Sequence, residues 1–221
     1  VVCDLCFHHC VLKEGQRGFC RARIVKHGKI ICENYGKITS LALDPIEKKP
    51  LRRFHPGSNI LSIGSYGCNM RCPFCQNHEI SMSETIPYHP ISPATLVELA
   101  CAKRKDGNIG IAFTYNEPLI SYEYVFDCAV AAKAKDLAVV IVSNGMIETT
   151  KLLALLPYVD AMNIDLKGFQ DNIYEELAGN LEQVKETIRC AAAHTHVEIT
   201  SLIVPRRNDA IADMLKIGRA H

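Results

Sequence analysis

The sequence has no large excess of charge of either sign. Its 25 lysine and arginine residues almost balance 24 aspartate and glutamate residues, which leaves a formal net charge of +1. A basic stripe that would bind nucleic acid and an acidic tail that would solvate a partner are both missing. We therefore expect no nucleic-acid partner for this chain.

Long apolar runs are missing as well. The longest ones are well short of the roughly 20 residues that a membrane-spanning helix needs. The N-terminus does not show the charged leader, apolar run and small-residue cleavage site of a secretory signal. We expect a cytoplasmic protein with no membrane partner.

The two ends of the sequence lack the usual features of a complete chain. Val1 stands where an initiator methionine would, and DMLKIGRAH has the pattern of a helix that is not finished. We therefore expect the chain to be a fragment of a longer protein.

Cysteine, in contrast, is abundant, with 11 residues among 221. One group crowds the N-terminus, a second group lies in the middle of the chain, and the others are isolated. In a reducing compartment, clustered cysteines indicate metal or redox sites more than disulfides. Isolated cysteines on apolar helical stretches are expected to be small buried hydrophobes.

The pattern of the chain changes near residue 57. Residues 1–57 are predicted to be a small Cys-rich unit that contains β-strands. Alternating residues on both sides of His27-Gly28 predict a hairpin, and residues 38–43 predict a third strand. The charged segment EKKPLRRFHPG that follows is expected to be a solvated loop.

Residues 58–221 alternate short apolar runs with helical patterns. The runs NILSIG, IGIAFT, LAVVIVSN, YVDAMNIDL and HVEITSLIVP predict strands, and the segments between most of them predict helices. Near-continuous apolar strands that alternate with helices are typical of a parallel sheet. A closed eight-unit barrel usually needs about 250 residues. We therefore predict an α/β fold with a partial, open (β/α) barrel that is C-terminally incomplete, with its ligands at the carboxyl ends of the strands.

The central cysteine group directly follows the first predicted strand of this barrel. Cys68, Cys72 and Cys75 lie within eight residues, and thiolates suit iron–sulfur clusters and zinc. A closed structural zinc site normally has four protein ligands. His78 could supply the fourth ligand, so that a zinc site is the alternative to a cluster.

The spacing C-x3-C-x2-C on this loop, with an aromatic residue before the last cysteine, resembles the radical S-adenosylmethionine (SAM) superfamily. The resemblance implies that the three cysteines ligate three irons of a 4Fe–4S cluster and that SAM chelates the fourth. It also implies an external one-electron donor, a 5′-deoxyadenosyl radical, and hydrogen abstraction from a substrate that the sequence does not identify.

Three longer segments narrow the resemblance. CDLCFHHCVLKEGQRGFCRAR, YGKITSLALDPIEKKPLRRFHPG and SIGSYGCNMRCPFCQNHEIS resemble the radical enzyme of the AmmeMemoRadiSam system, which is similar to pyruvate formate-lyase activating enzymes. The likeness runs from Cys3 to Pro205, and family members continue beyond it. One alternative is a glycyl-radical activating enzyme that acts on a protein. An alternative from another class is a zinc-binding structural or interaction module.

The resemblance assigns SAM contacts after two of the strands. AFTYNEP matches the position of a Gly-Gly-Glu motif, so Glu117 would accept from the methionine amino group, beside the backbone that begins at Thr114. The alternative for Glu117 is a charge at a helix N-terminus. VSNG would contact the ribose or the methionine carboxylate through Ser143 and Asn144, and the alternative is an ordinary Asn-Gly turn.

NIDLKG, at the end of the fourth strand, resembles an Asp-x-Lys element. Lys167 would face the methionine carboxylate, and Asp165 would orient it or hold a cation. Strand alternation places both side chains on the same face, where a merely buried charged pair would be costly. Phe74 is expected to pack near the adenine.

The N-terminal group offers four thiolates, from Cys3, Cys6, Cys10 and Cys20. They could close a tetrahedral zinc site or hold a second iron–sulfur cluster. His8 and His9 are alternative ligands. A metal would also stabilise a segment that is too small to build much core of its own.

Overall fold

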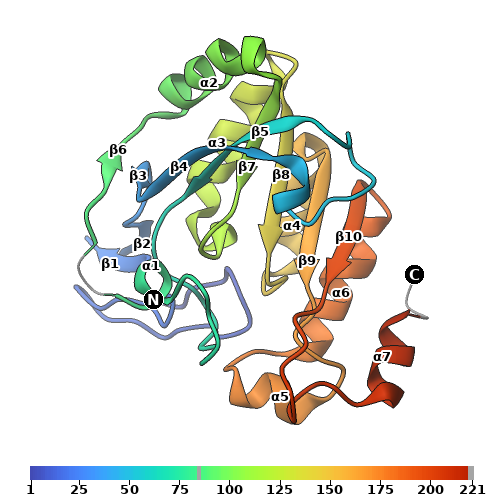
Figure 1. Cartoon of the computed structure of the whole chain (residues 1–221). Coiled ribbons are helices and arrows are strands. Elements are labelled where there is room, and N and C mark those ends of the chain that lie inside the picture. The colour runs from blue at the N-terminus through green and yellow to red at the C-terminus, as the bar shows by residue number, and fades with distance from the viewer. Residues whose placement is uncertain (84–85, 219–221) are drawn as a thin grey trace.

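The computed structural model describes residues 1–83 and 86–218 and is built on a six-stranded sheet (Figure 1). The order of the strands is β10-β9-β8-β7-β5-β4, and all pairs are parallel except β4 with β5. The bounds are Ser40–Pro45 (β4), Asn59–Gly64 (β5), Asn108–Phe113 (β7), Ala138–Ser143 (β8), Ala161–Asp165 (β9) and His196–Thr200 (β10). In the described residues β4 and β10 are the two edges, and the sheet is not closed. The predicted α/β fold with a partial, open barrel is confirmed.

Helices connect the parallel strands and pack against the sheet. The main connecting helices are α2 (Pro93–Ala102), α3 (Tyr122–Lys133) and α6 (Leu181–Ala192), and the shorter α4 (Thr149–Leu155) connects β8 to β9. Shorter helices are α1 (His78–Met82), α5 (Asp171–Glu176) and α7 (Ile211–Gly218), and 3-10 turns are η1 (Ile46–Lys48), η2 (Lys103–Asp106), η3 (Pro118–Ser121) and η4 (Leu156–Tyr158). Because five parallel strands follow one another in sequence order, their carboxyl ends all meet at one edge of the sheet.

Alternation along the strands produces two separate apolar layers. Successive strand residues point to opposite faces, so Ile111 and Ile141 belong to the large core beneath the helices. Their neighbours Ala112 and Val140 belong to a smaller cluster on the other face, which Ile46 and other residues of the β4–β5 connection cover. Both faces of the central strands are therefore buried, which explains their continuous apolar sequences.

The start of α2 is determined locally. Ser92 is the N-cap, and its Oγ accepts from the backbone N–H of Thr95 at 3.1 Å, with Pro93 in the first turn. We expect Ser92→Ala to lower the free energy of unfolding by about 1 kcal/mol, because one backbone donor loses its partner. Urea denaturation measures this, with Thr150→Ala on the exposed surface of α4 as the control. An equal loss in both variants would contradict the capping role.

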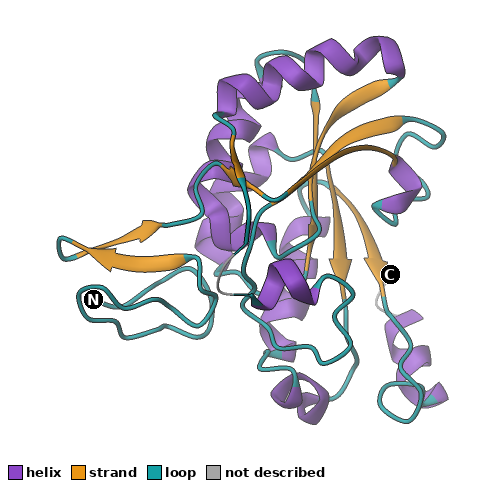
Figure 2. Cartoon of the chain, turned by 60° about the vertical axis from the view of Figure 1, so that its left-hand side comes forward, coloured by secondary structure: helices purple, strands orange, loops and turns teal. Residues whose placement is uncertain are grey.

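The N-terminal segment forms the predicted hairpin, which projects from the rest of the chain (Figure 2). Its strands are β1 (Arg23–Lys26) and β2 (Lys29–Cys32), and His27 and Gly28 have φ angles of 53° and 71° in the turn. A second small pair joins β3 (Lys37–Ile38) to β6 (His89–Pro90). The third predicted strand pairs as β4 with β5, so the chain enters the main sheet before residue 57. The division of the chain near this residue stays a prediction.

The segment EKKPLRRFHPG is not simply a solvated loop, and that prediction is wrong for two of its residues. Lys49 is 2% exposed and Leu51 is fully buried against the sheet. The Lys49 ammonium can be buried because its Nζ lies 2.9 Å from Oδ2 of Asp44. The backbone N–H groups of Arg52 and Arg53 donate to the Glu198 carboxylate on β10. The loop therefore crosses the open face of the sheet from β4 to β10.

Candidate active site

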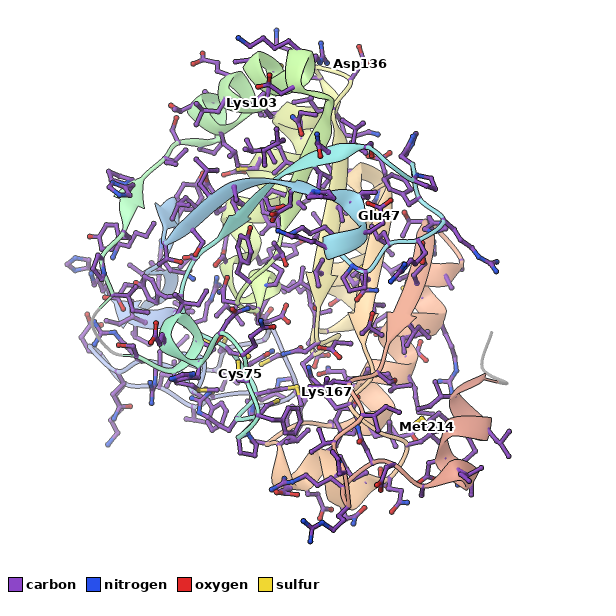
Figure 3. All side chains as sticks on the ribbon, in the orientation of Figure 1. Glu47, Cys75, Lys103, Asp136, Lys167 and Met214 are labelled. Carbon is purple, nitrogen blue, oxygen red and sulfur yellow. The ribbon has the colours of Figure 1, made fainter. Side chains whose placement is uncertain are left out.

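One cavity of about 320 Å³ lies at the carboxyl ends of β5, β7, β8 and β9. Figure 3 shows Cys75 and Lys167 together in this region, below the sheet. The lining includes every residue predicted for the central cluster and for SAM: Cys68, Cys72, Phe74, Cys75, Thr114, Glu117, Ser143, Asn144, Asp165 and Lys167. Predicted residues as far apart in the sequence as Cys68 and Lys167 meet there because parallel strands end at the same edge.

The cysteine loop places three thiols on the wall of this cavity. The Asn144 amide nitrogen is 3.7 Å from the Cys68 sulfur, and the Cys75 sulfur is 3.9 Å from the Ser81 hydroxyl. Burial raises the pKa of the Cys68 thiol to about 12 and that of Cys72 to about 11. The thiols of Cys68 and Cys72 therefore keep their protons at neutral pH unless a metal displaces them.

The donor set fits an iron–sulfur cluster better than a closed zinc site. His78 is exposed and belongs to a different hollow of the described surface. Within residues 1–83 and 86–218, no group of three or more Cys, His, Asp or Glu side chains converges on a position for a single metal ion. In a cluster each thiolate binds a different iron. Three thiols that share a cavity without converging on one ion are therefore compatible with a cluster.

Glu117 is the most deeply buried acid of the cavity, with 4% exposure. It accepts from the Ser143 hydroxyl at 2.9 Å, from the Asn144 N–H at 2.8 Å and from the Leu119 N–H at 3.0 Å. Burial raises the pKa of Glu117 to about 7, against the opposing effect of these donors. The contact with Leu119 makes Glu117 the N-cap of the 3-10 turn η3, which is the position that the alternative interpretation gave it. Its contact with SAM stays a prediction.

The side chain of Asn144 lines the cavity and is also hydrogen-bonded to the cysteine loop. Its Nδ2 donates to Oδ1 of Asn69 at 2.9 Å, and its Oδ1 accepts from the Met146 N–H at 2.9 Å. Gly145 follows in the left-handed region, with φ +76°. The turn that we considered as the alternative is therefore present. A contact of Ser143 and Asn144 with the ribose stays a prediction.

Asp165 and Lys167 form an ion pair at the rim of the cavity. The Lys167 ammonium donates to Oδ2 of Asp165, whereas Oδ1 of Asp165 is buried and has no hydrogen-bond partner in the described structure. Burial lowers the pKa of Lys167, but the neighbouring Asp165 carboxylate outweighs this and the net shift is upward. The pair presents a fixed cation and one unused carboxylate oxygen. A ligand with both a carboxylate and an amine would satisfy both.

The sequence reasoning missed a polar network beside the cavity. Tyr115 lines the cavity, and its hydroxyl donates to Oδ2 of Asp44 at 2.6 Å. The Lys49 ammonium binds the same carboxylate and lies 4.7 Å from the centre of the Tyr115 ring. Tyr115 also packs on Gly64, where an added Cβ would come within 2.8 Å of the tyrosine. In the sequence this network is visible only as an aspartate, Asp44, near the end of a mostly apolar strand. Its partners Tyr115 and Lys49 lie in other segments, so no local pattern connects them to it.

The N-terminal cysteines also meet in space. Cys3, Cys6 and Cys20 are buried, Cys10 is half-buried, and all four line a cavity of about 10 Å³. A cavity of this volume has room for about one molecule of the size of water. Of the alternative ligands, His8 bonds through Nε2 to the Asn69 carbonyl at 2.8 Å, and His9 lies 3.4 Å from Glu148. A metal at this place stays a prediction.

No helix in the described part of the chain combines the length and the apolarity that crossing a membrane requires.

Comparison with known families gives one match that covers most of the chain. A family model described as the Radical SAM superfamily matches residues 62–217. The matched segment begins in β5 and contains every residue that was predicted for the central cluster and for SAM.

Two relatives come from Methanocaldococcus jannaschii. The uncharacterized protein MJ0808 is 44% identical over 220 residues, which are 98% of this chain and 65% of the relative. The uncharacterized protein MJ0674 is 33% identical over 122 residues, 52% of this chain and 31% of the relative. The chain therefore spans less than two thirds of the length of the relatives it matches.

Three solved structures share the fold at low sequence identity. SuiB of Streptococcus suis bound to S-adenosylmethionine has a TM-score of 0.55 and 13% identity, over 73% of this chain and 38% of that chain. Methylornithine synthase has a TM-score of 0.51 and 14% identity, over 74% and 50%. TYW1 with a lysine-pyruvate adduct has a TM-score of 0.50 and 15% identity, over 72% and 61%.

Proposed function

The chain belongs to the radical SAM superfamily, and from this starting point we propose that its strand-end cavity is a SAM-cleaving active site. Members of this superfamily are enzymes of radical chemistry that use a 4Fe–4S cluster and SAM. The observation that carries the proposal is that one cavity joins the cysteine loop to Glu117 and to the Asp165–Lys167 pair. When bound at Cys68, Cys72 and Cys75, the cluster would supply the electron that cleaves SAM to the 5′-deoxyadenosyl radical, which takes a hydrogen atom from the substrate.

The chain's own residues would bind and orient the cofactors. The Asn144 amide, 3.7 Å from the Cys68 sulfur, would donate to a ligating thiolate and thereby influence the potential of the site. The Lys167 cation would hold the methionine carboxylate, and the unpaired Oδ1 of Asp165 would accept from a ligand donor. Glu117 would fix Ser143 and Asn144, and Phe74 would cover the adenine.

We expect Lys167→Met to weaken SAM binding by about 10- to 100-fold, because a buried charge-assisted contact disappears. The iron content should stay at the parent level, since the three cysteines are unchanged. Isothermal titration with SAM on the anaerobically reconstituted protein measures the effect. Lys185→Met on α6, whose ammonium pairs with Glu182 outside the cavity, is the matched control. If both variants bind SAM equally well, Lys167 does not contact the cofactor.

Anaerobic reconstitution with iron and sulfide tests the proposed function. The parent chain should take up iron and sulfide and, with a reductant and SAM, should form 5′-deoxyadenosine. Zinc alone at the central cysteines would reject the radical function and favour the zinc-binding module. A longer chain of the length of the relatives is the appropriate second sample, because this chain spans 65% of MJ0808.

The substrate and the partners determine which type of radical SAM enzyme the chain belongs to. We propose an enzyme of the AmmeMemoRadiSam type, with an external one-electron donor and a small-molecule or system-specific substrate. A glycyl-radical activating enzyme is the alternative, because it would use the same radical generator on a protein. Formation of a glycyl radical in a partner protein, detected by electron paramagnetic resonance, would favour that alternative.

We also propose a second metal site at Cys3, Cys6, Cys10 and Cys20, occupied by zinc or by a second iron–sulfur cluster. The common cavity of the four side chains supports it. In the described structure the four thiols do not converge on one ion position, so binding of a metal would have to draw them together. Metal analysis of a variant that lacks the three central cysteines tests this proposal separately. Retained stoichiometric zinc or iron would support the site, and a metal-free variant would reject it.

A further inference from the structure

A second and larger cavity, of about 920 Å³, lies beside the cysteine loop. The same loop contributes to both cavities, since Tyr66 and Arg71 line the larger one whereas Cys68 and Cys72 line the smaller one. The two cavities have no lining residue in common. The other described walls come from residues 15–37 and from Ser83, Ile86, Pro87 and Tyr88. Its chemically distinctive lining is Phe19, Arg21, Lys37, Tyr66, Arg71 and Tyr88.

Positive charge in this cavity is not balanced by the described acids. Glu33 is the one acidic residue among the described lining, and it pairs with Arg17, whose Nη2 is 2.8 Å from Oε1. Arg71 donates to carbonyl oxygens of Cys68, Met70 and Phe19, which carry no net charge. Burial, and then the charge of Arg21, lower the pKa of Arg71. Arg21 and Arg71 line the same cavity, so their guanidinium charges repel each other, and an anion bound between them would remove that cost.

Aromatic faces accompany these cations. The Lys37 ammonium lies 5.1 Å from the ring centre of Tyr88 and 5.9 Å from that of Tyr66. The Arg71 guanidinium stacks on Phe19 at 3.9 Å. Rings and a guanidinium plane are the surfaces on which planar ring systems stack in proteins. The cavity therefore combines anion-binding groups with stacking surfaces.

The size of the cavity restricts the ligand. Sites for small molecules usually have volumes of about 300–1,000 Å³, and an inorganic ion would leave most of this one unfilled. We propose that the cavity binds a ring-bearing phosphate of nucleotide size, with the phosphate between Arg21 and Arg71 and the ring against Tyr66 and Tyr88. This site is separate from the proposed SAM site, and it does not depend on the proposed function.

Binding of flavin mononucleotide (FMN), a fluorescent ring-bearing phosphate, tests the proposal, with adenosine monophosphate (AMP) as a second probe. Fluorescence and calorimetric titrations should show FMN binding at least about tenfold tighter than riboflavin or inorganic phosphate alone, because each of these offers only one of the two contacts. Excess S-adenosylhomocysteine should not displace FMN. Displacement would place the probe in the SAM cavity and overturn the proposal, as would the absence of binding by both FMN and AMP at millimolar concentration.

Arg21 is the residue to vary, because Arg71 also holds the carbonyls of the cysteine loop. We expect Arg21→Ala to weaken FMN binding by about tenfold and to leave riboflavin binding unchanged. Lys29→Ala, an exposed position on β2 outside the cavity lining, removes the same charge and should bind FMN as the parent does. Circular dichroism and thermal melting show that each variant is folded. Equal weakening in both variants would indicate non-specific attraction, and no change in Arg21→Ala would reject the phosphate position.

Discussion

Replacing Cys72 with alanine is expected to abolish the formation of 5′-deoxyadenosine, down to the level of a reaction without protein. Cys72 lines the cavity between Cys68 and Cys75, and an alanine methyl group cannot ligate iron. Two remaining thiols would hold the cluster weakly, so the bound iron and sulfide should fall together with the product. Iron and sulfide analysis and product chromatography on the anaerobically reconstituted variant measure both losses.

Cys101→Ala is the matched control for this experiment. Cys101 is a half-buried cysteine on α2 that packs at the edge of the helical core, away from the residues that line the SAM cavity. This variant should retain the parent's iron and product. If Cys72→Ala makes as much 5′-deoxyadenosine as the parent, the central cysteines do not hold the cluster and the proposed active site is wrong.

Replacing Asp44 with asparagine is expected to lower the free energy of unfolding by about 3–5 kcal/mol, because it leaves a buried ammonium without its counter-charge. Lys49 is 2% exposed, and among the described residues Asp44 is the acid that its ammonium contacts. The same carboxylate accepts from the Tyr115 hydroxyl at 2.6 Å. Since Tyr115 lines the proposed SAM cavity, SAM binding should weaken in parallel. Urea denaturation and SAM titration measure the two effects.

Asp106→Asn provides the control for the Asp44 variant. Asp106 pairs with Lys103 at 3.0 Å on the exposed surface of η2, where water screens both charges. We expect no measurable change in its stability. A comparable loss in both variants would show that Lys49 does not depend on Asp44.

The pH dependence of stability gives an independent check on the same network. Burial would raise the pKa of Asp44, but Tyr115, Lys49 and Lys48 together hold it well below its usual range. The pKa of such a carboxyl group is lower in the folded state than in the unfolded state, where it is about 4. The group therefore stabilises the folded state fully above about pH 4, and this contribution is lost as the pH falls toward the folded-state pKa. The stability difference between the parent and Asp44→Asn should therefore narrow below about pH 4. A constant difference down to acid pH would contradict the ionised state of Asp44.

Periodicity and local chemistry in the sequence determined the elements and their order. The apolar strands, the cap at Ser92 and the turn at His27-Gly28 each depend on residues that are close in the chain. The parallel arrangement follows from strand–helix alternation, and it implies that polar residues after successive strands meet. The residues predicted for the cluster and SAM were assigned through a family resemblance, and they lie on one cavity because they follow successive parallel strands.

The tertiary structure alone decided how these residues are paired. The charges around Lys49 predict a solvated loop, but the packing of that loop on the sheet brings the Lys49 ammonium to Asp44. Glu117 could be placed near SAM by resemblance, yet its bonds to Ser143 and Asn144 depend on the relative position of two strands. The larger cavity joins three segments that share no sequence pattern. Local patterns reflect the free energy of single elements, whereas ion pairs and cavities depend on contacts between elements far apart in the chain.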